Sequence, residues 1–215
     1  MSFNGFTQRD FEIFDLPDFS IRMPTLKSEI TPKLKALAEV IAPQLPEITG
    51  HSMHVHVAAH LRRTVNPPEE TWAAYAREKR AYKPFVHFRT AINGNGVKIA
   101  CFLEDYADDK LVFAANLAKS SSKIAAYLKK HPEILSYDMM DPYGKPLAGR
   151  SLNKKTLVEF SERLQNTKSQ HASFGIFIPR TNPIVFDGAA LSDEIIASIK
   201  TLMPIYQIGL PKELK

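Results

Sequence analysis

The sequence predicts an α+β fold in which a mainly antiparallel sheet packs against helices, within a single domain that spans residues 1–215. Three observations support this prediction. Apolar residues recur at helical spacing in some segments, they alternate at a two-residue spacing in others, and an Asn-Gly turn joins two of the alternating segments. A chain of 215 residues fits one domain, and it contains no internal repeat and no Gly/Ser-rich linker that would divide it.

The N-terminal segment predicts two helices. Thr7 followed by Asp10 is typical of a helix start. A stronger helical pattern covers residues 30–45, where apolar residues recur at steps of three and four and form one stripe that faces a core. Pro32 either is the first residue of this helix or kinks a longer helix that begins near Thr25.

The next segment predicts strands. Residues 53–61 alternate between apolar and mostly basic side chains, which is typical of a half-buried strand. Residues 71–76 and 85–92 are two further strands. The turn at residues 93–96 (Asn-Gly-Asn-Gly) then connects the second of these to a strand over residues 97–103, because Gly and Asn tolerate the positive φ angles of a tight hairpin.

The second half of the chain predicts helices and strands in alternation. The elements we expect are helices over 108–119 and 121–130 separated by a serine run, a strand over 134–139, a loop over 141–146, a helix that begins near Asn153, a strand over 172–178, and a last helix capped by Ser192.

The composition is that of a globular protein, with 44% hydrophobic and 24% charged residues. This apolar content argues against disorder, and 9 Gly and 1 Cys exclude collagen-like and disulfide-scaffold proteins. Cys101 lies in an apolar run, so we expect it to be a buried small side chain in a reducing compartment. Because neither a signal-peptide pattern nor an apolar run of about 20 residues is found, we expect a cytoplasmic protein that does not enter a membrane.

Positive charge and histidine are concentrated in one segment of the chain. The formal net charge is +5, and residues 51–89 hold seven Lys and Arg against three acidic residues, a surplus of four. The same segment holds five of the seven histidines. A basic surplus favours anionic partners without requiring them.

The two-residue strand period predicts that these basic side chains share a face. On the strand over 53–61 and its extension, one face carries His54, His56, His60 and Arg62. On the strand over 85–92, His87 and Arg89 share a face in the same way. If the two strands belong to one sheet, their basic faces coincide.

From this face we derive the hypothesis that the protein binds an anionic ligand, either a phosphate-bearing small molecule or a nucleic acid. Imidazole and guanidinium groups both donate hydrogen bonds to phosphate and carboxylate oxygens. Residues 75–83 interleave tyrosine with Lys and Arg, a pattern that nucleic-acid binders use. The candidate ligand-binding residues are His56, His60, Arg62, Arg63, Asn66, Trp72, Arg80 and His87.

Several alternatives stay open. In one alternative the basic face is only a solvated sheet surface, and in another it binds an acidic protein partner. In a further alternative the protein is a histidine-dependent hydrolase or phosphotransfer enzyme, with His56 or His60 as acid or base and Arg62 stabilising negative charge. The sequence assigns no catalytic residue and no oligomeric state.

Other chemistries have little support in the sequence. His54 and His56 could face one zinc ion, but no Cys or nearby carboxylate completes a ligand set, so we predict no metal and no cofactor. The chain has no Gly-x-Ser-x-Gly elbow and no Gly-x-x-x-x-Gly-Lys loop. His171-Ala-Ser173 matches one half of the paired His-x-Ser/Thr pattern of some phosphoesterases, and a second match is lacking.

Motifs in the first half of the chain carry a resemblance to a known family. They are Asn4-Gly-Phe-Thr7 followed by Asp10-Phe11, the string His56-Val-Ala-Ala-His60-Leu-Arg-Arg-Thr-Val-Asn-Pro-Pro68, Thr71-Trp72, and Arg80-Ala-Tyr-Lys83 with His87-Phe88. With these motifs the chain resembles the YktB-like family of uncharacterised bacterial proteins. The resemblance implies a single α+β domain in a cytosolic protein, and it implies no activity and no catalytic residues.

Overall fold

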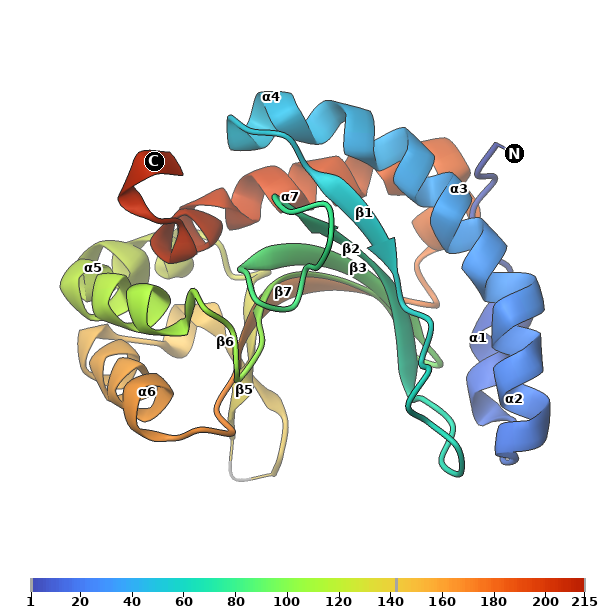
Figure 1. Cartoon of the computed structure of the whole chain (residues 1–215), viewed down its shortest axis with the longest axis horizontal. Coiled ribbons are helices and arrows are strands. Elements are labelled where there is room, and N and C mark those ends of the chain that lie inside the picture. Colours follow the sequence, from blue (N-terminus) through green and yellow to red (C-terminus); the bar gives the residue numbers. More distant parts are fainter. Residues whose placement is uncertain (1, 142, 215) are drawn as a thin grey trace.

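A computed structural model of the chain describes residues 2–141 and 143–214. Its strands form one seven-stranded antiparallel sheet within these residues, in the order β1-β2-β3-β4-β7-β5-β6 (Figure 1). The α+β prediction with a mainly antiparallel sheet is therefore confirmed. The strands are β1 (His54–Val57), β2 (Glu70–Ala76), β3 (His87–Asn93), β4 (Gly96–Leu103), β5 (Leu135–Met140), β6 (Pro146–Ala148) and β7 (Ala172–Pro179).

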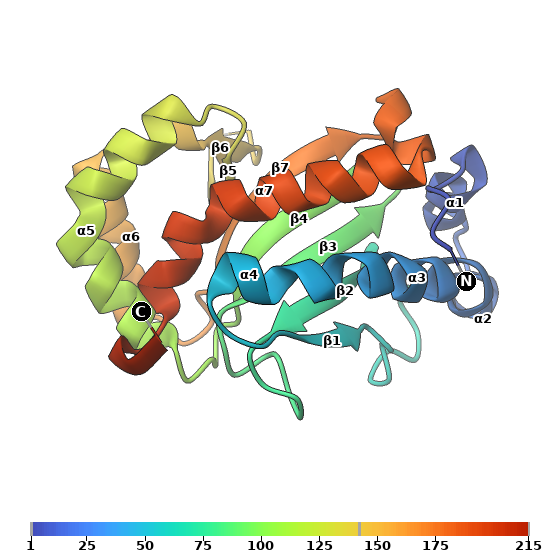
Figure 2. The same cartoon turned by 90° about the horizontal axis from the view of Figure 1, so that it is seen from above.

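The helices cover one face and both ends of a curved sheet. They are α1 (Gln8–Glu12), α2 (Phe19–Thr25), α3 (Thr31–Ile41), α4 (Leu45–Thr49), α5 (Lys110–Lys130), α6 (Lys154–Asn166) and α7 (Gly188–Gly209). Helices α3, α4 and α7 lie across the convex face (Figure 2), while α5 and α6 flank one end and α1 and α2 the other (Figure 1). No described helix covers the concave face, which we call the open face.

The pleat of each central strand divides its residues between the core and the open face. In β4, Ile99 and Cys101 are buried in the core beneath the helices, and Phe102 lies on the open face. In β3, Phe88 stacks on Tyr206 of α7 with ring centroids 4.6 Å apart. The core therefore lies between the sheet and its convex-side helices, and polar residues of the same strands are left for the open face.

The predicted hairpin is confirmed, with Asn93 paired to Gly96 across a two-residue turn. The Asn93 side chain accepts hydrogen bonds from the backbone N–H groups of Asn95 and Gly96, at 2.8 and 3.1 Å. Gly96 has φ +157°, and a Cβ atom there would lie 2.2 Å from the Ile178 carbonyl oxygen of β7. Glycine is needed at this position because the neighbouring strand approaches so closely.

The N-terminal helical pattern combines features of both alternatives: Pro32 lies in the first turn of α3, and a longer helical run is present but begins at Phe19 rather than near Thr25. Helical structure continues from α2 through a π-helical turn (Leu26–Ile30) into α3, so that Pro32 lies inside a longer helical segment. A proline lacks the N–H that would close a regular turn, and the wider turn ahead of it accommodates that loss.

Three elements differ from their prediction. The serine run does not interrupt α5, where the Ser121 hydroxyl donates to the Ala118 carbonyl at 2.8 Å. Asp187 caps α7 by accepting from two backbone N–H groups at 3.0 Å, while the Ser192 hydroxyl lies inside the helix and donates to Gly188. β6 was not predicted, and only its first residue, Pro146, falls in the predicted loop over 141–146. Of the predicted loop over 141–146, Pro142 lies outside the described residues.

The first strand is shorter than predicted, and this changes the basic face. β1 ends at Val57, and His60 has φ +49°, which belongs to a turn. His54 and His56 share a face of β1, but His60 and Arg62 lie in the loop that follows it. The expectation that all four share one strand face is therefore corrected.

Candidate functional site: a pocket on the open face of the sheet

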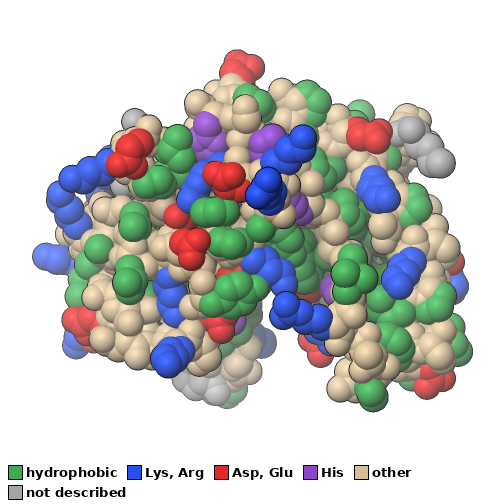
Figure 3. Space-filling model, viewed as in Figure 1, with side chains coloured by type: hydrophobic (Ala, Val, Ile, Leu, Met, Phe, Trp, Pro, Cys, Tyr) green, Lys and Arg blue, Asp and Glu red, His purple; other side chains and the backbone are tan. Residues whose placement is uncertain are grey.

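A pocket of about 550 Å³ opens on the concave side of the sheet, and we call it the open-face pocket. The space-filling view shows this underside hollowed between two flanks, with Lys and Arg side chains near its mouth (Figure 3). Across the sheet, Arg89 is paired with Ala74 of β2 and with Ala100 of β4, and Ala100 is paired with Gly175 of β7. These small residues leave room for the hollow. Its basic side chains are Arg63, Arg89, Lys98 and His171.

Arg89 of β3 is fixed at the centre of the open-face pocket, with only 5% of its side chain exposed. Its guanidinium carbon lies 3.7 Å from the Phe102 ring centroid and 4.7 Å from that of Trp72. Its Nε donates to Nε2 of His87 at 2.8 Å, and its Nη2 pairs with Glu104. Among the described residues no hydrogen bond engages Nη1, so this group is available to a ligand.

His87 holds Arg89 in position. It is fully buried, and its Nδ1 donates to the Phe85 carbonyl at 2.7 Å while its Nε2 accepts from Arg89. Burial, together with the neighbouring charge of Arg89, lowers the pKa of His87 well below its ordinary value. His87 is therefore a neutral positioning residue rather than a cation that meets a ligand.

His171 and Asp138 form a second polar group in the open-face pocket. His171 Nε2 lies 2.7 Å from Asp138 Oδ1, and the other Asp138 oxygen accepts from the Ser173 backbone N–H. The His171 ring stacks on Phe102 with centroids 5.7 Å apart. The hydrogen bond to Asp138 is the main reason that the pKa of His171 is raised above its ordinary value.

The raised pKa of His171 predicts a pH-dependent contribution to stability. Since its pKa is higher in the folded than in the unfolded chain, the stabilisation is fully present below about pH 6.5, the unfolded value, and disappears as pH rises through the folded pKa. The variant His171→Gln should therefore lose more unfolding free energy at about pH 5.5 than at about pH 8.5 in urea titrations. Asp138→Asn should remove the pH dependence, and an equal loss at both pH values would contradict the assignment.

Carboxylates balance the cations of the open-face pocket. Lys98 Nζ lies 2.6 Å from Glu70 and 5.0 Å from the Tyr137 ring centroid. Glu69 also lines the pocket. Lys98, Arg89 and His171 are therefore each held by a carboxylate, and each cation keeps N–H groups that its pair does not use.

Of the predicted histidines, His60 contacts Trp72, which lines the pocket, and His56 contacts Tyr82. His60 Nε2 lies 3.1 Å from the Thr71 hydroxyl, and its ring meets the Trp72 ring edge-on at 5.3 Å. Burial, with the charge of Arg63, lowers the pKa of His60. His56 Nε2 lies 3.0 Å from the Glu78 carbonyl oxygen. Neither His56 nor His60 lines the open-face pocket.

The remaining candidate ligand-binding residues lie in two exposed loops. Arg63 lines the open-face pocket, and its Nη1 donates to the Asn66 carbonyl at 3.4 Å. Arg62 and Asn66 are exposed in the same loop, which projects beside the open face (Figure 1). Arg80 is exposed in the loop between β2 and β3 and does not line the pocket.

Part of the pocket lining was not among the candidate residues. The side chains that were not predicted come from the start of β2, from β3, β4 and β5, and from the start of β7: Glu69, Glu70, Arg89, Lys98, Phe102, Tyr137, Asp138, His171 and Ser173. A signal existed for three of them, because Arg89 shares the predicted basic face with His87, and His171-Ala-Ser173 begins an alternating strand with two polar residues on one face. Placing that face beside β4 requires the pairing of strands that are distant in sequence.

Comparison with known proteins agrees with the resemblance seen in the motifs. Residues 6–206 match a family model described as a domain of unknown function, DUF1054. The chain belongs to this family. The resemblance to the YktB-like bacterial proteins is thereby confirmed.

Relatives of the chain match it over nearly their whole length. A UPF0637 protein of Oceanobacillus iheyensis is 30% identical over 213 residues, which are 96% of this chain and 97% of the relative. A UPF0637 protein of Bacillus licheniformis is 33% identical over 216 residues, 97% of each chain. A third, of Leuconostoc citreum, is 32% identical over 210 residues, 94% of this chain and 98% of the relative.

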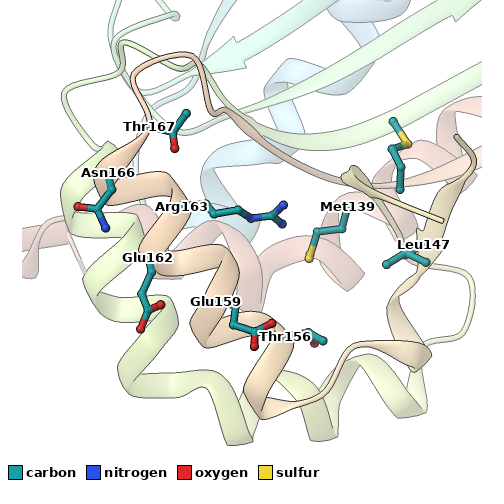
Figure 4. Close-up of a pocket in the computed structure, with 9 residues that line it drawn as sticks. Met139, Leu147, Thr156, Glu159, Glu162, Arg163, Asn166 and Thr167 are labelled. Atoms are coloured by element: carbon teal, nitrogen blue, oxygen red, sulfur yellow. The ribbon is translucent and has the colours of Figure 1, made fainter. Parts of the chain in front are cut away.

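A second pocket, of about 520 Å³, lies between α6 and the β5–β6 hairpin (Figure 4). Arg163 projects from α6 toward Met139, and Glu159 and Leu147 lie at its rim. None of the candidate residues lies there. Across residues 2–141 and 143–214, no three His, Cys, Asp or Glu side chains gather closely enough to hold a metal ion, and no helix has the length and apolar character of a membrane span.

Proposed function

We propose that the open-face pocket binds an anionic small molecule in the cytoplasm. The observation that carries this proposal is the fixed guanidinium of Arg89, which lies between Trp72 and Phe102 and whose Nη1 has no hydrogen-bond partner among the described residues. A guanidinium held in one orientation binds phosphate or carboxylate with little further loss of side-chain entropy.

Two further cations support the proposal. Lys98 and Arg63 line the same pocket as Arg89, so three permanent positive charges surround one hollow. Glu70 holds Lys98, Glu104 holds Arg89, and Arg63 donates to the Asn66 carbonyl. An anion gains charge-assisted hydrogen bonds to the N–H groups that remain. Arg89 is buried against aromatic rings, and hydrogen bonds to a buried charged group are stronger than those in water.

The test uses the fluorescence of Trp72, the single tryptophan of the chain, which lines the open-face pocket. Titration with inorganic phosphate should change this fluorescence saturably. Arg63→Ala should weaken phosphate binding by about threefold to tenfold, as expected for the loss of one charge-assisted hydrogen bond. The matched control Arg80→Ala removes an exposed arginine that does not line the pocket and should leave the affinity unchanged.

Two results would argue against the proposal. The absence of saturable phosphate binding to the wild-type chain, by both fluorescence and calorimetry, would reject anion binding in this pocket. Equal effects of Arg63→Ala and Arg80→Ala would show that phosphate responds to the general positive charge of the protein rather than to the pocket.

If the protein is an enzyme, the geometry favours His171 as its acid or base, rather than His56 or His60. His56 and His60 do not line the open-face pocket, so the acid or base role expected for them has no support in this geometry. His171, held by Asp138, is the imidazole of the pocket that a hydrolase or phosphotransfer reaction would use. Ligand binding remains the function that the geometry supports best.

A further inference from the structure

We infer that the ligand of the open-face pocket is a phosphorylated polyol or sugar rather than a nucleic acid. The inference rests on the proposed function and narrows its ligand class. Three features of the pocket carry it: the occupied faces of its aromatic rings, the carboxylates in its lining, and two hydroxyl groups that have no hydrogen-bond partner in the part of the chain that the structure describes.

The aromatic rings of the pocket are already stacked. Phe102 lies on β4, between Arg89 of β3 and His171 of β7, and it contacts both through its ring. Arg89 also covers Trp72, and Lys98 lies over Tyr137. Proteins bind single-stranded nucleic acid largely by stacking bases on open aromatic faces. Here cations and an imidazole take those faces, which disfavours a nucleobase.

The lining carboxylates also discriminate between ligands. Glu69, Glu70 and Asp138 lie in the pocket beside its cations. A chain of phosphodiesters would bring several negative charges close to these acids. Each carboxylate has more acceptor positions than its observed partner uses, so a ligand with hydroxyl donors can bond to them. A single phosphate attached to a hydroxyl-bearing carbon chain fits both kinds of group.

Two hydroxyl groups of the pocket also favour a phosphorylated polyol or sugar as the ligand. Ser173 is 2% exposed, and among the described residues neither its Oγ nor the Tyr137 hydroxyl has a hydrogen-bond partner. Both residues line the open-face pocket. Buried polar groups are normally hydrogen-bonded, and a sugar hydroxyl can donate and accept at such positions. The volume of about 550 Å³ is in the range of a single small-molecule ligand.

The experiment compares four kinds of probe on the whole chain, by Trp72 fluorescence and calorimetry. They are inorganic phosphate, a set of phosphorylated polyols (glycerol 3-phosphate, ribose 5-phosphate and glucose 6-phosphate), unphosphorylated glucose, and a thymidine oligonucleotide of about ten nucleotides. At least one phosphorylated polyol should bind about tenfold more tightly than inorganic phosphate. Glucose and the oligonucleotide should show no saturable binding.

The variant Ser173→Ala tests whether the Ser173 hydroxyl contributes to the preference for a phosphorylated polyol over inorganic phosphate. It should weaken binding of the preferred phosphorylated polyol by about threefold to tenfold and leave the affinity for inorganic phosphate within about twofold. Circular dichroism and the melting temperature check that the variant is folded, and Ser151→Ala, an exposed serine outside the pocket, is the matched control.

The outcomes separate the two proposals. If phosphate binds and no phosphorylated polyol binds more tightly, the ligand class is wrong while anion binding stands. Tighter binding of the oligonucleotide than of every polyol overturns the inference in favour of a nucleic acid. If neither phosphate nor any phosphorylated polyol binds, the proposed function itself fails.

Discussion

Replacing Asp109 by alanine is expected to lower the free energy of unfolding by about 3–5 kcal/mol. Asp109 is buried at the start of α5 and accepts from both terminal nitrogens of Arg77, at 2.6 and 2.8 Å. It also accepts from the backbone N–H of Val86 at 2.8 Å. The variant would leave the Arg77 guanidinium, itself about 10% exposed, without its charge partner.

The neighbouring residue provides the control for this prediction. Asp108 is exposed, and Asp108→Ala should change the unfolding free energy by no more than about 0.5 kcal/mol. Urea unfolding of both variants and of the wild type gives the comparison. A loss below about 1 kcal/mol for Asp109→Ala would show that the Arg77–Asp109 pair contributes far less than a buried pair should.

The Arg77–Asp109 pair also connects stability to the open-face pocket. Arg77 begins the loop between β2 and β3, and Val86 precedes β3, the strand that carries His87 and Arg89. Asp109 therefore fixes both ends of this loop against α5. We expect Asp109→Ala to disturb the pocket as well, since the start of β3 loses its anchor.

Local signals predicted much of the sheet correctly. The Asn-Gly turn at residues 93–96 fixes the β3–β4 hairpin because few other conformations suit that sequence. The prediction of β2 and β7 rested on short apolar runs that are bounded by turns or by proline. The prediction was less accurate where tertiary packing overrides propensity: α5 continues through its serines because buried residues on both sides, such as Leu117 and Ile124, belong to one core-facing stripe.

The candidate site was predicted only in part, and the reason is physical. The segment rich in His and Arg does supply Trp72, Arg63, His87 and its neighbour Arg89 to the pocket region. The other wall comes from β5 and β7, which join the sheet through pairing of β7 with β4. Such pairing depends on the global arrangement of strands, which local periodicity does not determine.

The structure also differs from the prediction in which side chains of the basic face are charged. From spacing alone, His87 and Arg89 were equivalent members of one basic face. The structure makes them unlike: buried His87 accepts a hydrogen bond from Arg89 and is neutral, while Arg89 keeps its charge beside Glu104. Burial and partner choice, rather than residue type, decide which of the two carries a charge.

Replacing Arg89 by lysine is expected to lower the affinity for inorganic phosphate at least about tenfold, or about 1.4 kcal/mol. Lysine keeps the positive charge next to Glu104, so an unpaired acid is not left behind. It lacks the planar group that lies between Trp72 and Phe102, and it lacks the second nitrogen that can face a ligand while the first holds Glu104. The loss of binding should therefore reflect geometry rather than charge.

The control is Arg62→Lys, which makes the same exchange at an exposed residue that does not line the pocket and should leave phosphate affinity within about twofold. Trp72 fluorescence measures binding in both variants, and the melting temperature shows whether each is folded. If folded Arg89→Lys binds phosphate as tightly as the wild type, a point charge suffices at this position and the fixed guanidinium is not the binding group. Anion recognition would then have to rest on Lys98 and Arg63, whose variants would show the larger losses.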